Sequence, residues 1–239
     1  MNVSPPRLTE NDREPLREDL REPLREQIPA TLRAALNDIS PAFGQHPLPD
    51  PGRDPAPMLE ATREAWGGKT DLWVFGYASL IWRPDFAVAE QRLANVHGWH
   101  RALKMWSRVN RGTPACPGLV FALLSGGSCQ GMVLRVPHAD AHEVLQKLWH
   151  REMVTGVYDP KWLHCTTHSG PVRALAFTLS RKSRNFTGDL QDAQYQQIFS
   201  EACGRYGTTL DYARQTFLGL KEHGIHDHAL ERLLLHAPG

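Results

Sequence analysis

Apolar and polar positions divide the chain into an N-terminal stretch without periodicity and a patterned remainder. Eleven of the eighteen prolines fall in residues 1–57, where Phe43 is the only aromatic residue. The sequence Arg-Glu-Pro-Leu-Arg-Glu occurs at 13–18 and again at 21–26, and a proline in each copy prevents one continuous helix. Because such a segment buries too little apolar surface to offset the entropy of ordering, we expect residues 1–56 to be a largely disordered extension.

The patterned remainder, residues 57–239, is expected to form one domain. Within the extension a short helix is possible at 28–39, and a second helix is expected at 57–66, where the domain begins. Leu72–Phe75 is a continuous apolar run that ends at Gly76, which predicts a buried strand followed by a turn.

Further apolar runs predict strands that are separated by glycine or proline, including a linker at Gly126-Gly127. These strands are expected at 95–109, 118–124, 129–136, 161–167 and 172–179. Helical spacing occupies 141–152 and dominates 189–235. Strands first and helices last indicate the α+β class. No glycine-rich phosphate-binding motif follows any strand, so nucleotide-binding folds have no support.

Composition and charge narrow the classes of partner. The 239 residues carry 27 basic and 26 acidic side chains, a formal charge of +1, which favours neither a nucleic-acid nor a membrane partner. No apolar run approaches the length of a membrane span, and the polar N-terminus does not resemble a signal peptide. The four cysteines lie far apart without a CxxC pair, so we expect a reducing compartment, the cytoplasm.

One acidic side chain occupies an unexpected position in the helix predicted at 141–152. Asp140 and Glu143 resemble a capping pair at its start. At 100° per residue, Glu152 falls near the middle of the apolar stripe formed by Ala141, Val144, Leu145, Leu148 and Trp149. Burial and the helix C-terminal dipole would both raise the pKa of Glu152 toward the range of a general acid–base. Two alternatives remain: Arg151 neutralises the carboxylate, or the helix ends before residue 152.

Two segments of the chain resemble signature motifs of one enzyme family. The nonapeptide at 74–82, VFGYASLIW, resembles the VFGYGSLIW signature of the ChaC-type γ-glutamylcyclotransferases. The segment at 148–158, LWHREMVTGVY, is similar to the family's L-W-x-R-E-M-x-x-G-x-Y motif and contains Glu152. Matches at 98–102 and 112–118 lie between them in the family's order, and the resemblance runs from about residue 71 to 235.

The resemblance implies a γ-glutamylcyclotransferase-like fold, a small mixed β-barrel with packed helices. It implies cleavage of glutathione to 5-oxoproline and cysteinylglycine, without a metal or an organic cofactor. Glu152 is carried over as the catalytic carboxylate. The residues carried over for the γ-glutamyl group are Val74, Phe75, Gly76, Tyr77, Ala78, Ser79 and Leu80. Tyr158 and Tyr212 resemble family tyrosines that line the pocket, although core packing is an equal alternative for both.

Alternatives in function and in side-chain roles remain open. The protein could cyclise other γ-glutamyl amines or amino acids, or bind γ-glutamyl peptides without catalysis, and the N-terminal extension could bind an unknown partner. Tyr77 could contact substrate or brace its turn, and Ser79 is expected to be a donor or cap. Arg108 and Arg111 could bind an anionic tail of the substrate, but a solvated loop is expected for both. The family usually has glycine where this chain has Ala78, so we predict a negative φ there.

Overall fold

The computed structural model describes residues 52–154 and 156–238. The extension predicted at 1–56 therefore lies almost entirely outside the described residues, and so does the short helix at 28–39. The first described helix, α2 (Ala56–Trp66), confirms the helix expected at 57–66.

Five strands form a closed barrel in the order β1-β3-β2-β4-β5. Their bounds are β1 (Leu72–Gly76), β2 (Glu90–Ser107), β3 (Gly118–Val136), β4 (Asp159–Thr167) and β5 (Gly170–Thr178). β1 pairs antiparallel with β3 and parallel with β5, where Val74 is opposite Leu175. This mixed pairing confirms the predicted fold class, and closure leaves the barrel no unpaired long edge.

The strands expected at 118–124 and 129–136 are in fact one strand, β3. The prediction of a linker at Gly126-Gly127 is wrong because these residues form a bulge within the strand. In the pairing with β2, His97 is opposite Ser128 and Trp99 is opposite Ser125, so two glycines face Gly98 alone. All three glycines have positive φ, which permits the extra residue without ending the strand.

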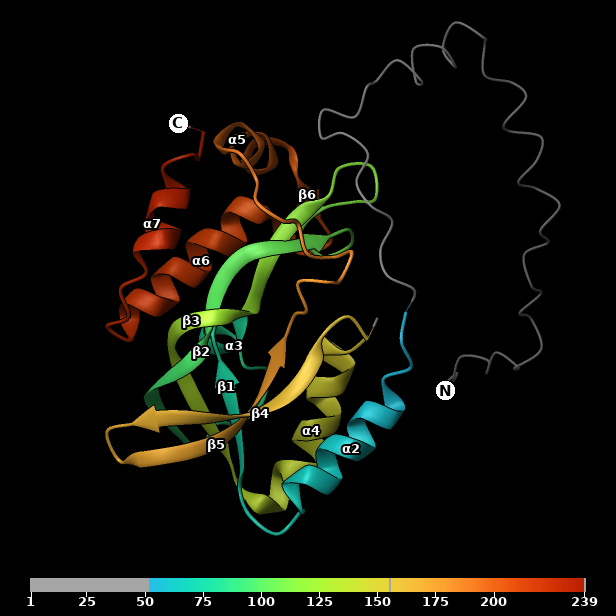
Figure 1. Cartoon of the computed structure of the whole chain (residues 1–239), viewed down its shortest axis with the longest axis vertical. Coiled ribbons are helices and arrows are strands. Elements are labelled where there is room, and N and C mark those ends of the chain that lie inside the picture. The colour runs from blue at the N-terminus through green and yellow to red at the C-terminus, as the bar shows by residue number, and fades with distance from the viewer. Residues whose placement is uncertain (1–51, 155, 239) are drawn as a thin grey trace, which may run out of the picture. The chain divides into compact units, whose positions relative to one another are not determined.

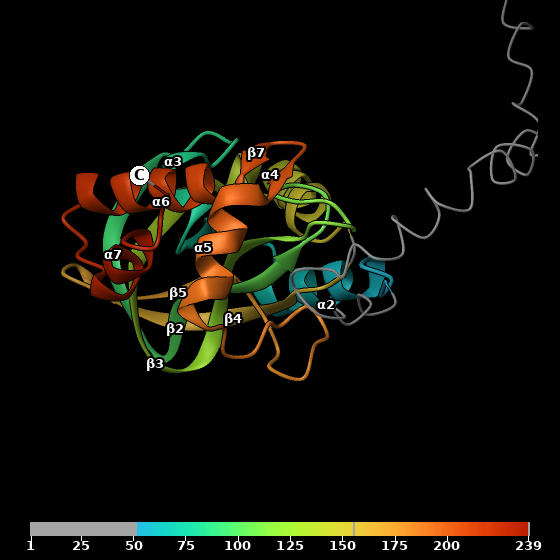
Figure 2. The same cartoon turned by 90° about the horizontal axis from the view of Figure 1, so that it is seen from above.

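Helices cover two sides of the barrel. α2 and α4 (His138–Glu152) lie on one side and α6 (Thr209–Glu222) and α7 (His228–Leu234) on the other, as Figures 1 and 2 show from two directions. The remaining described elements are α3 (Ser79–Trp82), α5 (Asp192–Glu201) and a small hairpin of β6 (Cys203–Gly204) and β7 (Gly207–Thr208). The hairpin interrupts the region predicted to be helical.

The helix predicted at 141–152 is present but begins three residues earlier, at His138. The predicted capping pair is wrong: Asp140 lies within the first turn, and Glu143 forms an ion pair with Lys147 at 2.6 Å. A distant side chain satisfies the helix N-terminus instead, because Asp71 Oδ1 accepts a hydrogen bond from the His138 N–H at 2.9 Å. The start of α4 is therefore tied to the residue that precedes β1.

The short helix α3 is held against α6. Trp82 Nε1 donates to Thr216 Oγ1 at 3.3 Å, and a Cβ at Gly219 would lie only 3.0 Å from Trp82 Cβ. The two helices can approach this closely because residue 219 has no side chain. The contact fixes α3, and with it the turn that connects α3 to β1.

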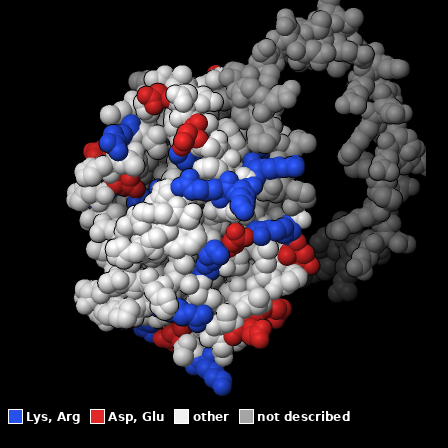
Figure 3. Space-filling view, viewed as in Figure 1, with Lys and Arg blue, Asp and Glu red and all other residues white. Residues whose placement is uncertain are grey.

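The surface carries charges of both signs. On the face drawn in Figure 3, Lys and Arg side chains form a short band, with acidic side chains around it on a mostly uncharged surface. Across residues 52–154 and 156–238, no helix is both long and apolar enough to cross a membrane.

Candidate active site

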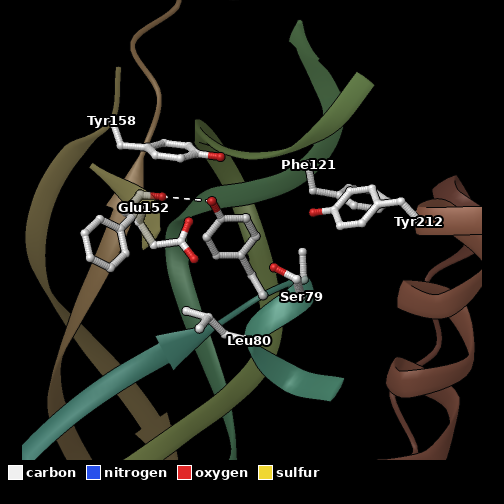
Figure 4. A pocket seen from close by; sticks show the side chains of 9 residues that line it. Ser79, Leu80, Phe121, Glu152, Tyr158 and Tyr212 are labelled. Atoms are coloured by element: carbon white, nitrogen blue, oxygen red, sulfur yellow. Dashed lines mark hydrogen bonds between the residues drawn. The ribbon is translucent and has the colours of Figure 1, made fainter. Parts of the chain in front are cut away.

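A small pocket opens where the β1–α3 turn, the end of α4 and helix α6 converge on the barrel. The free space among its lining atoms, open solvent at the mouth included, is about 300 Å³, of which only about 20 Å³ admits the centre of a water-sized sphere. The lining residues come from several parts of the chain: Tyr77, Ala78, Ser79, Leu80, Phe121, Glu152, Tyr158, Phe177 and Tyr212. Figure 4 shows the Glu152 carboxylate and the hydroxyl groups of Ser79, Tyr158 and Tyr212 directed toward this space.

Glu152 is the last residue of α4 and faces the interior. The five predicted stripe residues are the buried residues of this helix, and the Glu152 side chain is only 16% exposed. Burial is the largest effect on this carboxyl group and raises its pKa above 4.5, while Arg151 opposes the shift and Asp85 adds to it. The alternative in which the helix ends before residue 152 is therefore wrong.

Arg151 connects the carboxylate to the rest of the site. Its Nε lies 2.9 Å from Glu152 Oε1, its Nη1 lies 2.7 Å from Asp85 Oδ2, and its Nη2 donates to Ser79 Oγ at 3.0 Å. Arg151 is thus paired within the protein. The alternative in which Arg151 pairs with Glu152 is therefore correct about the ion pair. The pKa of Glu152 is nevertheless raised, because the effect of burial is larger than the effect of Arg151.

Three tyrosines surround the pocket. Tyr77 donates its hydroxyl to the Phe177 carbonyl at 2.9 Å, so in the free protein it braces the turn. Burial raises the pKa of Tyr212 to about 12 and the pKa values of Tyr77 and Tyr158 well above 10.0. All three phenols therefore stay protonated near neutral pH, and Tyr158 and Tyr212 present neutral hydroxyl groups to the pocket.

The β1–α3 turn brings only part of the predicted binding segment to the pocket. Tyr77 to Leu80 line it, whereas Val74, Phe75 and Gly76 do not. Val74 and Phe75 are fully buried in β1, which is paired on both sides, so the chain reaches the pocket only after the strand ends. Ala78 has φ −146°, which confirms the predicted negative φ.

Comparison with known proteins agrees with these motifs and this fold. The family model described as ChaC-like protein matches residues 72–237. The chain belongs to the ChaC-like family. The glutathione-specific γ-glutamylcyclotransferase of Escherichia coli (strain K12) is 32% identical over 181 residues, which cover 75% of this chain and 78% of that relative. The human glutathione-specific γ-glutamylcyclotransferase 1 is 32% identical over 171 residues, covering 69% and 76%.

A solved structure supports the fold of this ChaC-like chain. The crystal structure of a yeast γ-glutamylcyclotransferase specific to glutathione matches with a TM-score of 0.64 and 22% identity. The match covers 70% of this chain and 96% of the yeast protein. At this identity the likeness establishes a shared fold.

Two residues of the pocket, and the burial of a third residue near it, escaped the sequence interpretation of this ChaC-like chain. Phe121 on β3 and Phe177 on β5 line the pocket. The alternation of apolar residues along a strand indicates which face is buried, but it does not indicate which end of the barrel forms the pocket. The prediction of a solvated loop is wrong for Arg111, which is 7% exposed because it packs 5.0 Å from the ring centre of Tyr212. Arg111 also donates to the carbonyls of Tyr206 and Thr208.

Proposed function

We propose that this ChaC-like protein is a γ-glutamylcyclotransferase that cleaves glutathione to 5-oxoproline and cysteinylglycine. The observation that carries the proposal is the buried carboxylate of Glu152, with a raised pKa, in a pocket formed by the β1–α3 turn and two neutral tyrosine hydroxyls. The bacterial and human relatives are named as specific for glutathione, and we infer the same substrate for this chain.

The reaction is an intramolecular displacement. The lone pair of the substrate's α-amine forms a C–N bond to its own γ-carbonyl carbon, and the carbonyl π-electrons move to oxygen. The tetrahedral intermediate then re-forms the C=O bond and expels the amide nitrogen of cysteinylglycine. Nucleophile and electrophile belong to one molecule, so a pocket that holds the cyclising rotamer removes much of the barrier, up to about 7–11 kcal/mol in well-oriented systems.

Glu152 handles the protons. As a carboxylate it accepts a proton from the attacking amine, and as a carboxylic acid it returns that proton to the departing nitrogen. Burial moves the pKa of Glu152 upward from 4.5, which makes its acid form easier to reach at a given pH and so suits the second of these steps. Such transfer contributes about 10²–10⁴-fold to a rate.

Hydrogen-bond donors around the pocket hold the substrate's oxygens. Tyr158 and Tyr212 offer hydroxyl groups that stay neutral, and the backbone of residues 77–80 offers N–H groups at the β1–α3 turn. Preorganised donors of this kind stabilise the negative charge that develops on the γ-carbonyl oxygen, and they also suit the substrate's α-carboxylate.

The four cysteines are free thiols, which supports a cytoplasmic location, where glutathione keeps thiols reduced.

Product analysis tests the proposal. The purified protein is incubated with glutathione and, in parallel, with γ-glutamyl-alanine, each with and without a chelator, and products are quantified by mass spectrometry. We expect equimolar 5-oxoproline and cysteinylglycine from glutathione in both conditions. Faster release from γ-glutamyl-alanine would replace glutathione by a broader γ-glutamyl class. Binding of glutathione without any product would overturn the enzymatic proposal in favour of a binding module.

A further inference from the structure

A buried arginine outside the pocket contacts the backbone of the β1–α3 turn. Arg101, on β2, is 5% exposed. Its Nη1 donates to the Tyr77 carbonyl at 2.9 Å and to the Gln130 carbonyl at 3.0 Å. Its Nε and Nη2 both donate to Asp227 Oδ2, at 2.8 and 2.6 Å. One guanidinium therefore links three segments of the chain.

Asp227 connects this arginine to the C-terminal helix. It is the N-cap residue of α7, and its other oxygen, Oδ1, accepts a hydrogen bond from the Leu230 N–H at 2.9 Å. The Asp227 side chain is 14% exposed, so the ion pair with Arg101 is shielded from water. The two carboxylate oxygens of Asp227 have different partners: Oδ2 accepts from Arg101, and Oδ1 caps the N-terminus of α7.

The Tyr77 carbonyl and the Ala78 N–H belong to the same peptide group. No peptide bond among the described residues is cis, and in a trans peptide the C=O and N–H vectors point in opposite directions. Tyr77 and Ala78 line the pocket, whereas Arg101 is not among the lining residues. The carbonyl points toward Arg101, which does not line the pocket, and the Ala78 N–H therefore points away from Arg101. Within the described part of the chain, that N–H donates no hydrogen bond.

We propose that Arg101, oriented by Asp227, is a positioning residue that fixes the Tyr77–Ala78 peptide and so directs the Ala78 N–H at an oxygen of the substrate. The proposal rests on the proposed function, which supplies the substrate. The Tyr77 hydroxyl is already fixed by the Phe177 carbonyl, and Arg101 fixes the backbone end of the same residue. A lysine would not replace Arg101, because its single ammonium lacks the planar array of donors that reaches both carbonyls and the carboxylate.

The test compares three variants with a matched control. Arg101→Met removes the donors, Arg101→Lys keeps the charge, and Asp227→Asn removes the orienting charge but keeps an N-cap residue. The control is Arg135→Met: this half-buried arginine on β3 also has carboxylate partners, Asp71 and Glu90, but lies outside the pocket.

Steady-state kinetics with glutathione provide the first readout. We expect kcat/KM to fall by about 10²-fold in Arg101→Met, the scale of losing one aligned donor. Arg101→Lys is expected to recover little of this loss, and Asp227→Asn to show a smaller decrease. Arg135→Met should stay within about threefold of the wild type. A folded Arg101→Met variant with the kinetics of Arg135→Met would overturn the proposal.

Nuclear magnetic resonance of the substrate-free protein provides the second readout. The Tyr77 carbonyl carbon and the Ala78 amide should shift in Arg101→Met and Asp227→Asn but not in Arg135→Met. Unchanged resonances in both variants would also overturn the proposal. If the wild type released no 5-oxoproline, the proposed function would fail, yet these resonances would still decide whether Arg101 sets the peptide. If Arg101→Met does not fold, Arg101→Lys and Asp227→Asn decide by the same readouts.

Discussion

Replacing Glu152 by glutamine separates the chemistry of this site from its architecture. The amide has almost the shape of the carboxyl group, and its oxygen can still accept the 2.9 Å contact from Arg151 Nε. It cannot accept a proton from the substrate amine. If proton transfer contributes about 10²–10⁴-fold, 5-oxoproline release falls by that factor, which corresponds to about 2.7–5.4 kcal/mol of transition-state stabilisation.

The same substitution has a pH-dependent effect on stability. Burial raises the folded-state pKa of Glu152 above 4.5, so its contribution to the free energy of unfolding is fully present below about pH 4.5 and decreases as pH rises through the folded pKa. Glutamine does not ionise. The melting temperature of Glu152→Gln minus that of the wild type should therefore increase as pH rises from about 4.5 to 8.

Glu143→Gln is the matched control on the same helix. Glu143 is exposed and pairs with Lys147, which lowers its pKa, so its contribution is present above about pH 4.5 and disappears as pH falls. Activity should be unchanged, and the effect of Glu143→Gln on melting temperature should stay constant between about pH 4.5 and 8 and disappear only below that range. If folded Glu152→Gln released 5-oxoproline at more than about a fifth of the wild-type rate, the assignment of proton transfer to Glu152 would be refuted.

Three further outcomes follow from the geometry. The acidic limb of the kcat/KM profile should have its midpoint above 4.5, because Glu152 must be ionised to accept a proton and its pKa is raised; a midpoint at or below 4.5 would contradict the assignment. Ala78→Gly should alter kcat/KM by less than about threefold, since the negative φ at residue 78 is not one that requires glycine; a large gain would mean that the methyl group impairs the site. In Gly131→Ala the new Cβ would lie 2.4 Å from the Gly76 carbonyl oxygen, so urea unfolding should give a loss of about 1–3 kcal/mol.

Local patterns in the sequence identified most of the barrel and the central carboxylate. A strand that is buried on both sides appears as a continuous apolar run, which located β1, and helical spacing was enough to place Glu152 on the buried face of α4. The family resemblance brought the turn at 77–80 and two tyrosines to the same site. These predictions were possible because each depends either on residues that are close together in the chain or on a family motif that contains the residues concerned.

The features that escaped the sequence depend on partners far along the chain. α4 begins at His138 because Asp71, 67 residues earlier, accepts its N–H. Arg101 pairs with an aspartate 126 residues later. Neither contact leaves a spacing signal, because periodicity records only which face of an element is apolar. Phe121 and Phe177 belong to this class too, since barrel closure decides which inward side chains meet the pocket.

The bond from the Tyr77 hydroxyl to the Phe177 carbonyl joins residues 100 positions apart, and the pocket also needs Tyr212 from α6. During translation, a ribosome-bound chain that has just been extended to Glu152 still lacks Phe177 and Tyr212, which line the pocket. If Glu152 has the proposed role, turnover should begin only after residue 212 has left the exit tunnel, so truncated products that end earlier would contain Glu152 without consuming substrate.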